Sequence, residues 1–335
     1  MFSGSSRETP ERIGFLLVPE FSMMAFFSAV EPLRVANRLS GQHLYSWHIF
    51  SCDGEPVAAS NGMTVVADAP IAKVEHFPAV IVCASFDPER YVTKPLLSWL
   101  RRLDRQGAEL GAIDTAPQIL ARAGLLNGCR VTLHWEHLPS FREAFPDIEV
   151  SDELFEIDGK RFTCSGGTAS LDMMLNMISR RHGQDLAIAV SEQLLHDRIR
   201  SPGDHQRMAL DLRLGVRHPK LIMILEAMEH SVEEPLPLDR LAEIGRISRR
   251  QLERLFRSYL DETPTGYYLK LRLRRARHLL EQTDMSVMEI AMACGFVSAP
   301  YFSRAYRGLF GRAPRDDRRI VRLRREQATG AITAI

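Results

Sequence analysis

The first 190 residues alternate short apolar runs with segments whose apolar residues recur at helical spacing. The apolar runs predict strands at 12–18, 45–52, 62–67, 79–84, 109–113, 131–134 and 161–165. The helical patterns predict helices, notably at 22–39, 94–106, 116–124, 136–145 and 168–182. Continuous apolar strands alternating with helices are typical of a largely parallel sheet covered on both faces, so we expect an α/β domain here.

The last third of the chain shows helical patterns that repeat one arrangement, at 238–260 and again at 286–311. In each copy a short helix with an apolar face meets a turn, and a second helix begins at a serine, which is a favourable N-cap residue. The glycine near the turn and the serine are Gly245 and Ser248 in the first copy, Gly295 and Ser298 in the second. The pattern predicts an all-α domain with two helix-turn-helix motifs.

The second helix of each predicted motif has one apolar face and one face rich in arginine. These arginines are Arg249, Arg250, Arg254 and Arg257, then Arg304 and Arg307. Such faces are usually only solvated surface. Two copies joined by one helix over 265–282 could however enter successive major grooves about 34 Å apart. We therefore expect binding to double-stranded DNA.

Charge divides the chain into two parts. Residues 215–335 contain 22 Lys and Arg against 15 Asp and Glu, and residues 1–214 contain 21 against 27, so the net charge of +1 combines a basic part with an acidic one. A basic domain attracts phosphate and gains from counterion release. We expect the two parts to have different functions, with domains at 10–195 and 216–320 and a linker at 196–215.

The C-terminal part resembles the DNA-binding domain of the AraC/XylS family. The residues that carry the resemblance are Leu241, Ala242, Ser248, Arg249, Leu252, Arg254, Phe256, Pro264, Tyr268, Arg272, Ala276, Leu279, Leu280, Ile290, Ala291, Cys294, Gly295, Phe296, Phe302, Arg304, Phe310, Gly311 and Pro314. Asp261 replaces the usual glycine, and Asp317 replaces a common closing tyrosine. Asp tolerates the left-handed conformation better than most residues.

The same resemblance implies which residues face DNA. On the first reader helix they are Arg250, Glu253 and Arg254, with Arg249 adjacent, and on the second they are Ala299, Pro300, Tyr301 and Arg304. Arginine presents a pair of donors that matches two acceptors of guanine. As in the family, we expect RNA polymerase as a partner and activation of transcription as the outcome.

The N-terminal part resembles the class I glutamine amidotransferase-like, PfpI-type domain, which has a flavodoxin-like fold. The resemblance lies in segments 111–128 (GAIDTAPQILARAGLLNG), 131–138 (VTLHWEHL) and 164–175 (CSGGTASLDMML). In that family a strand ends in a sharp turn, the elbow, which carries a nucleophilic cysteine. Asp114 stands at that position here.

Replacement of the thiol favours a sensor over an enzyme, because the family's chemistry requires a thiolate at the elbow. His134, at a position where the family often has histidine, then has no thiol to activate. We expect a ligand-responsive regulator without catalytic residues. The alternatives are an active PfpI-like hydrolase, amidase or hydratase with a fused DNA-binding domain, and a constitutive DNA-binding protein whose sheet domain only forms dimers.

The resemblance also implies a ligand pocket at the elbow. Its expected lining is Asp114, Thr115, His134, Trp135, Glu31, Ser28, Ser85 and Phe86. A carboxylate at a concave site needs a cation or donor, and a nearby aromatic ring attracts cations. Segment 21–41 resembles regulators of arginine, glycine betaine and carnitine breakdown, so we expect a quaternary amine or basic amino acid as effector. In the alternative, Asp114 only caps the helix that follows it.

Other features narrow the class of protein. No run reaches the twenty apolar residues of a membrane helix, and the N-terminus lacks a secretory pattern, so we expect a cytoplasmic protein, a homodimer through its N-terminal domain. The five cysteines have no paired spacing. His134 and His137 could ligate a metal, but no third ligand is evident in the sequence. We expect neither metal nor cofactor.

Overall fold

The computed structural model describes residues 10–321 and 323. The chain divides into two compact units, Met1–Gln206 and Arg207–Ile335, and each is described by itself. The division falls inside the segment predicted as a linker.

The first unit contains a seven-stranded sheet in the order β10-β11-β7-β6-β1-β2-β5. The strands are β1 (Glu11–Leu17), β2 (Tyr45–Ser51), β5 (Ala69–Pro70), β6 (Ala79–Ala84), β7 (Glu109–Asp114), β10 (Phe155–Asp158) and β11 (Arg161–Cys164). Every neighbouring pair is parallel except β10 with β11, which form an antiparallel edge. Two short pairs lie outside it, β3 (Val57–Ala58) with β4 (Thr64–Val65) and β8 (Arg130–Val131) with β9 (Glu149–Val150). The prediction of a largely parallel sheet is confirmed.

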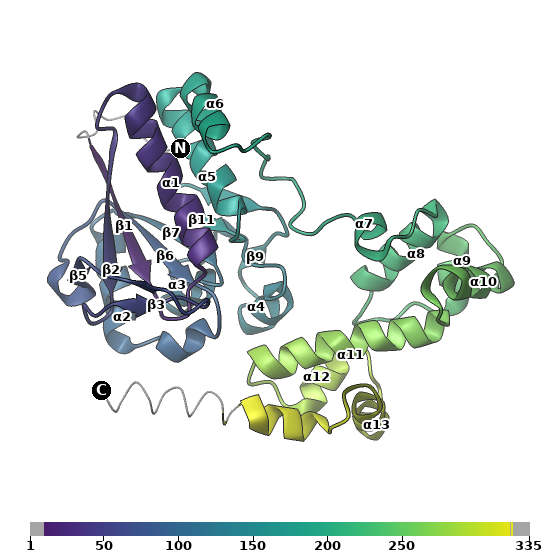
Figure 1. The fold of residues 1–335 in the computed structure, drawn as a ribbon. Helices are drawn as coiled ribbons and strands as arrows, with labels where there is room; N and C mark the ends of the chain where they lie inside the picture. The colour runs from purple at the N-terminus through teal and green to yellow at the C-terminus, as the bar shows by residue number, and fades with distance from the viewer. Residues whose placement is uncertain (1–9, 322, 324–335) are drawn as a thin grey trace. The chain divides into compact units, whose positions relative to one another are not determined.

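Helices cover both faces of this sheet (Figure 1). One group is α1 (Met23–Ser40), α5 (Ala169–His182) and α6 (Gln184–Gln193), and the other is α2 (Lys94–Arg105), α3 (Pro117–Arg122) and α4 (Leu138–Ala144). The short 3-10 helices are η1 (Ile71–Lys73) and η2 (Pro88–Tyr91). Successive residues of β1 enter opposite cores, with Phe15 on one side and Leu16 on the other. Both faces of the sheet are therefore buried, which explains why its strands are unbroken apolar runs in the sequence.

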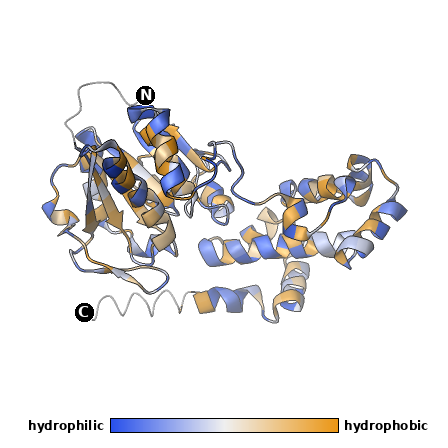
Figure 2. Cartoon of the chain, turned by 45° about the horizontal axis from the view of Figure 1, so that its top comes forward, coloured by the Kyte–Doolittle hydropathy of each residue, from blue (hydrophilic) through white to orange (hydrophobic). Residues whose placement is uncertain are grey.

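The described residues of the second unit form only helices and the loops between them, and residues 314–321 add a helical segment after those named next. Its helices are α7 (Leu210–Leu214), α8 (Pro219–His230), α9 (Leu238–Ile244), α10 (Arg249–Leu260), α11 (Pro264–Gln282), α12 (Val287–Ala293) and α13 (Ala299–Phe310). One core packs α8, α9 and α10 against the first half of α11, and another packs α12 and α13 against its second half. Hydrophilic and hydrophobic residues alternate along α11 in Figure 2, as expected for a helix that is buried on one side and exposed on the other.

The predicted N-caps of the two reader helices are confirmed. Ser248 accepts a hydrogen bond from the backbone N–H of Gln251 at the start of α10, and Ser298 accepts one from Tyr301 at the start of α13. Asp261 ends α10 with φ 51°, the left-handed conformation that usually calls for glycine. Its replacement of the family glycine is therefore tolerated locally.

The two turn glycines differ in backbone conformation and in what a side chain at each position would meet. At Gly245 the backbone is right-handed, and a Cβ would lie 2.5 Å from the end of the Ile224 side chain, so a larger residue there would require that side chain to move. Gly295 has φ +72°, and a Cβ would lie 2.7 Å from the Glu233 carbonyl oxygen. Here both conformation and space demand glycine.

The segment predicted as a linker, 196–215, contains two kinds of structure. Residues 196–206 make hydrogen bonds to the rest of the first unit, and α7 lies in the second part of the segment. Among the described residues, none of the helices has the length and apolar character needed to cross a membrane.

Candidate DNA interface and elbow site

The first candidate surface is the outer face of α10. Arg250, Glu253, Arg254 and Arg257 are all exposed there, while Leu252 and Phe256 are buried beneath them. Within the part of the chain that the structure describes, no ion pair involves Arg250 or Arg254. Their guanidinium groups can therefore meet a ligand without first breaking a salt bridge.

Arg249 differs from its neighbours. Its Nε lies 3.1 Å from Asp239 Oδ1, so the guanidinium is bound to a carboxylate of α9. This exposed pair ties the beginning of α10 to the preceding helix and is worth little in free energy. Contact between Arg249 and a phosphate would compete with it.

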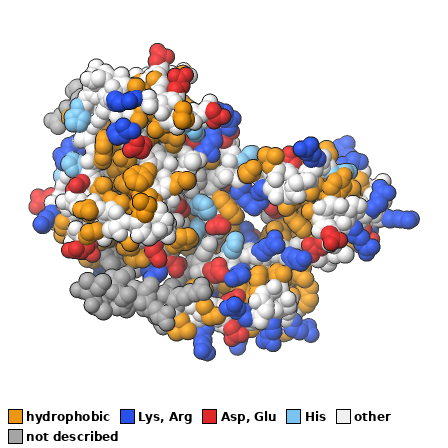
Figure 3. Space-filling model, viewed as in Figure 1, with side chains coloured by type: hydrophobic (Ala, Val, Ile, Leu, Met, Phe, Trp, Pro, Cys, Tyr) orange, Lys and Arg blue, Asp and Glu red, His pale blue; other side chains and the backbone are white. Residues whose placement is uncertain are grey.

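The second candidate surface is the start of α13. Pro300, Tyr301 and Arg304 are exposed, and Ala299 is half-buried. Together with the fully exposed Val297 before the helix, they give this reader a more apolar surface than that of α10. Figure 3 shows Lys and Arg side chains gathered on the helical unit.

Arg272 holds the second motif in place from α11. Its Nε and Nη2 donate hydrogen bonds to the carbonyl oxygens of Cys294 and Gly295, at 2.8 and 2.6 Å. Its guanidinium also lies 4.0 Å from the centre of the Phe296 ring. One arginine therefore holds the turn Cys294–Phe296 against α11.

The elbow lies at the carboxyl end of β7. Asp114 has φ 64°, a left-handed conformation that is strained for a residue other than glycine, asparagine or aspartate. Its carbonyl oxygen accepts a hydrogen bond from the backbone N–H of His134 at 3.1 Å. The next residue, Thr115, donates its hydroxyl to the carbonyl oxygen of Ser85 at 2.6 Å. The structure thus brings four of the predicted ligand residues together.

Asp114 is buried, and its burial raises the pKa of the carboxyl from 3.8 to about 7. A hydrogen bond with Ser85 lowers this pKa and the charge of Glu136 raises it, but both effects are smaller than that of burial. Burial lowers the pKa of His134, so at neutral pH this imidazole supplies no positive charge. Near pH 7 the elbow therefore holds a carboxyl group poised between its neutral and charged forms.

The alternative in which Asp114 merely caps the next helix is wrong. That helix, α3, begins at Pro117 with Ala116 at the N-cap, and no side chain makes a capping hydrogen bond there. The Asp114 side chain instead interacts with Ser85 after β6. The reason is the left-handed turn, which places two residues between the elbow and the helix.

The other expected lining residues lie in different places. Trp135 follows His134, with 5.6 Å between the ring centres. It is partly buried against the core that α2, α3 and α4 form on their face of the sheet. Phe86 follows Ser85 and is 60% exposed at the same end of the sheet. Ser28 and Glu31 lie further along α1, where Glu31 forms a 2.6 Å salt bridge with Arg34. Among the described residues, no hydrogen bond or ion pair joins either of these two residues to Asp114.

Gly166 is an elbow residue that sequence reasoning missed. A Cβ at this position would lie 2.8 Å from the Cβ of Asp114, and its φ is +86°. The motif CSGG was visible in the sequence, but only the fold brings Gly166, on the loop after β11, against the end of β7.

The buried thiols near the elbow are poor nucleophiles. Burial raises the pKa of Cys83 well above its usual value and that of Cys164 to about 12, so both remain protonated. Within the described residues, no group of three or more His, Cys, Asp or Glu side chains could hold a metal ion. His137 instead contacts Gln118, with 3.3 Å between Nδ1 and Nε2.

Known proteins similar to this chain share both of its parts. A helix-turn-helix domain model matches residues 241–320, and a DJ-1/PfpI family model matches residues 11–180. The HTH-type transcriptional regulator CdhR of Pseudomonas aeruginosa is 52% identical over 315 residues, which cover 94% of each chain. The HTH-type transcriptional regulator GbdR of the same species is 51% identical over 309 residues, which cover 92% of this chain and 84% of that one.

A solved structure is similar to part of the chain. The crystal structure of an AraC family transcriptional regulator from Pseudomonas putida superposes with a TM-score of 0.51 at 27% identity. The match covers 55% of this chain and 100% of that one.

Proposed function

The chain belongs to the HTH-type transcriptional regulators that combine a DJ-1/PfpI family domain with an AraC-type DNA-binding domain, and on that premise we propose that it senses a small cationic amine at the elbow. Residues 10–195 would sense the ligand, residues 216–320 would bind an operator, and residues 196–215 would connect these two domains. Asp114 carries this proposal, because it is a buried carboxyl whose pKa is about 7.

A cation is the partner that such a carboxyl favours. Ionising a buried carboxyl costs desolvation free energy, and a positive ligand at the same place offsets that cost. Asp114 places a carboxyl at the turn itself, and Glu136 adds negative charge nearby. Trp135 offers an aromatic face, which is worth about 0.5–2 kcal/mol towards a cation. Glycine betaine, carnitine and arginine all carry such a positive group.

The proposal includes a sensor domain without catalytic turnover. The family elbow carries a thiol, and Asp114 replaces it. Cys83 and Cys164 are buried near Asp114. Their thiol pKa values are raised, so they do not supply a thiolate. The relatives reported above are named transcriptional regulators. Esterase, amidase or hydratase turnover abolished by Asp114→Asn would contradict this part.

DNA reading would use both reader helices. Arg250, Glu253 and Arg254 of α10, with Arg249 beside them, would contact one major groove, and Ala299, Pro300, Tyr301 and Arg304 of α13 the next. We further propose that the protein activates transcription through RNA polymerase. It would act as a homodimer through its first unit, where Met24 and Phe27 of α1 are 63% and 47% exposed.

The decisive experiment is titration calorimetry of the full chain with glycine betaine, L-carnitine and L-arginine. We expect one of them to bind, and Asp114→Asn to weaken that binding tenfold or more. Asp147→Asn removes an exposed carboxylate of the same unit and serves as the control. Equal affinity of both variants and the parent chain would refute a role for Asp114, and absence of binding by all three amines would refute the effector class.

A further inference from the structure

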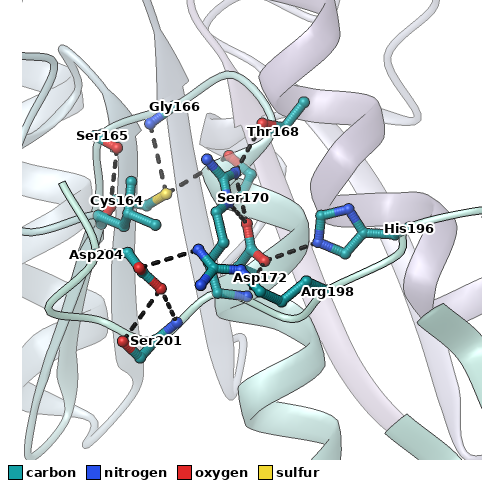
Figure 4. Close-up of polar contacts among 12 residues, drawn as sticks. Cys164, Ser165, Gly166, Thr168, Ser170, Asp172, His196, Arg198, Ser201 and Asp204 are labelled. Carbon is teal, nitrogen blue, oxygen red and sulfur yellow. Dashed lines mark hydrogen bonds and ion pairs between the residues drawn. The ribbon is translucent and has the colours of Figure 1, made fainter. Parts of the chain in front are cut away.

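The chain that leaves α6 towards the second unit lies against the first unit. We call residues 196–206 the strap. Figure 4 shows His196 of the strap directed at Asp172 of α5, with Arg198, Ser201 and Asp204 of the strap nearby. The strap ends at Gln206, the last residue of the first unit.

The first anchor of the strap is Asp172, whose exposed fraction is 0%. Its Oδ1 accepts hydrogen bonds from His196 Nε2 at 2.8 Å and from the backbone N–H of Arg200 at 2.7 Å. Its Oδ2 accepts one from Arg200 Nε at 2.8 Å. Both oxygens of this buried carboxylate are satisfied, and hydrogen bonds to a charged group are the strong ones. This end of the strap is firmly held.

The second anchor is the amide of Gln206. Its Nε2 lies 3.0 Å from Thr132 Oγ1, 3.0 Å from the Leu133 carbonyl oxygen and 2.8 Å from the Glu153 carbonyl oxygen. An amide nitrogen has two hydrogens for these three acceptors. Its Oε1 is buried and has no hydrogen-bond partner among the described residues. A buried acceptor left unsatisfied costs free energy, so this end is the easier one to release.

Two strap residues bind the segments that contact Asp114. Arg200 Nη2 donates to Thr168 Oγ1 at 2.7 Å, and Thr168 is two residues beyond Gly166, which packs on Asp114. Gln206 binds the carbonyl of Leu133, and the next residue, His134, donates its N–H to the Asp114 carbonyl. Asp114 thus lies between two segments that the same strap holds.

We propose that Arg200 and Gln206 are positioning residues of the elbow, and that through them the occupancy of the proposed ligand site is transmitted to the DNA-binding unit. A ligand that displaces Leu133 and His134 changes the acceptors of Gln206. Gln206 directly precedes the second unit, so its release lengthens the free chain before α7. Asp172 meanwhile keeps its hydrogen bonds to His196 and Arg200. The ligand part of this inference rests on the proposed function, while the positioning part stands on the contacts alone.

The positioning part is tested without ligand, by hydrogen exchange in the full chain. Gln206→Met keeps the size of the side chain and removes its amide. We expect the amide of His134 to exchange at least tenfold faster in this variant. Gln193→Met, at the exposed end of α6, makes the same change away from the strap and should leave that exchange unaltered. Unaltered exchange in Gln206→Met as well overturns the proposal.

The transmission part is tested by DNA affinity, using a fragment selected from a random pool by the parent chain. Affinity is measured with and without whichever of glycine betaine, L-carnitine and L-arginine the parent chain binds. We expect Gln206→Met and Arg200→Met to lose the ligand-induced change in affinity. Arg198→Met, a 66% exposed strap residue paired with Asp204, should keep it. A merely structural role would alter stability and leave this ratio intact, so a retained ratio in both variants refutes transmission.

The two proposals fail in distinguishable ways. If no amine binds the parent chain, the proposed effector class is wrong, and the exchange of His134 alone decides the positioning role. If an amine binds and alters DNA affinity equally in Gln206→Met and in the parent chain, the effector proposal stands and the strap is not its route.

Discussion

Gly166 lies so close to Asp114 that a Cβ on residue 166 would come within 2.8 Å of the Asp114 Cβ. Its φ of +86° is also one that other residues rarely adopt. The loop after β11 therefore forms a wall that fixes the elbow carboxyl. Glycine at 166 serves the geometry of the site, not only that of a turn.

We expect Gly166→Ala to lower the free energy of unfolding by roughly 3 kcal/mol or more, through both backbone strain and the clash with Asp114. Gly167→Ala is the matched control, because Gly167 also has a positive φ but a Cβ there meets nothing within 4 Å. It should cost about 1–2 kcal/mol. Urea unfolding of the full chain, followed by circular dichroism, measures both, and equal losses would contradict the clash.

The raised pKa of Asp114 predicts how stability depends on pH. The carboxyl has a pKa of about 7 in the folded chain and 3.8 as its ordinary value, so the folded state binds the proton more tightly. The stabilising contribution is fully present below about pH 4 and is lost as the pH rises through 7. The loss amounts to up to about 4 kcal/mol, because one pKa unit corresponds to about 1.4 kcal/mol.

Asp114→Asn removes this titration. Other groups also titrate, so the informative quantity is the difference in unfolding free energy between parent and variant, measured in urea at pH 5 and pH 8. We expect the variant to gain stability relative to the parent chain at the higher pH. A difference that is the same at both pH values would show that the Asp114 pKa is near its ordinary value.

The two kinds of arginine on α10 predict different binding defects. Arg254→Ala should weaken operator binding and relax the preference at particular base pairs, by about 1–3 kcal/mol of discrimination. Arg257→Ala, one turn further along, should weaken binding to all DNA sequences equally. It should also reduce the slope of log affinity against log salt concentration by about one. Binding to a panel of single-base operator variants at two salt concentrations separates them. Identical base preferences in the Arg254→Ala variant and the parent chain would remove Arg254 from the reading surface.

Asp317, which replaces the family's usual tyrosine, has a partner that sequence reasoning did not identify. The buried Tyr306 hydroxyl donates a hydrogen bond to Asp317 Oδ2 at 2.8 Å, and Arg312 Nε lies 3.2 Å from Oδ1. Tyr306→Phe deprives the carboxylate of its buried donor, so we expect a loss of about 1–3 kcal/mol in unfolding free energy. Tyr301→Phe, on the exposed face of α13, should cost almost nothing. Similar losses in both would mean that the pair contributes little.

The sequence was most informative where one local rule decided the structure. Continuous apolar runs marked β1, β6 and β7, because strands buried on both faces have no polar alternation. Serines at 248 and 298 marked the beginnings of α10 and α13, because capping is a local hydrogen bond. The left-handed conformation of Asp261 also followed from residue type and position.

The sequence was least informative where distant residues meet. Strand β10 was missed because its residues are only partly apolar and it pairs at an edge, and α6 was missed although it packs on α1 and α5. The role of Gly166 depends on Asp114, 52 positions earlier, and the anchors of the strap lie at Asp172 and Leu133. Nothing local to 196–206 reveals such partners, so its polar composition indicated a linker.

Amine binding should release a proton from Asp114. A cationic ligand favours the charged carboxylate, so the carboxyl, whose pKa is about 7 in the free protein, should have a lower pKa in the complex. Affinity should therefore rise with pH up to about 7 and level off above it, where the carboxyl is already ionised. Between pH 6 and pH 7 the gain should approach roughly fivefold if the pKa in the complex falls well below 6, because the ionised fraction of the free carboxyl rises from about one tenth to one half.

Calorimetry measures this coupling directly. Titrations at pH 6.5 in two buffers of different ionisation enthalpy give the number of protons released, which we expect to be between 0.5 and 1 by the titration of a single group near pKa 7. His134 contributes less to this effect, because burial lowers its pKa below the usual 6.5 and less than half of the imidazole is protonated at this pH. In Asp114→Asn the buffer dependence should vanish along with most of the affinity. An amine that binds tightly with no proton release in the parent chain would show that its positive group is held away from Asp114.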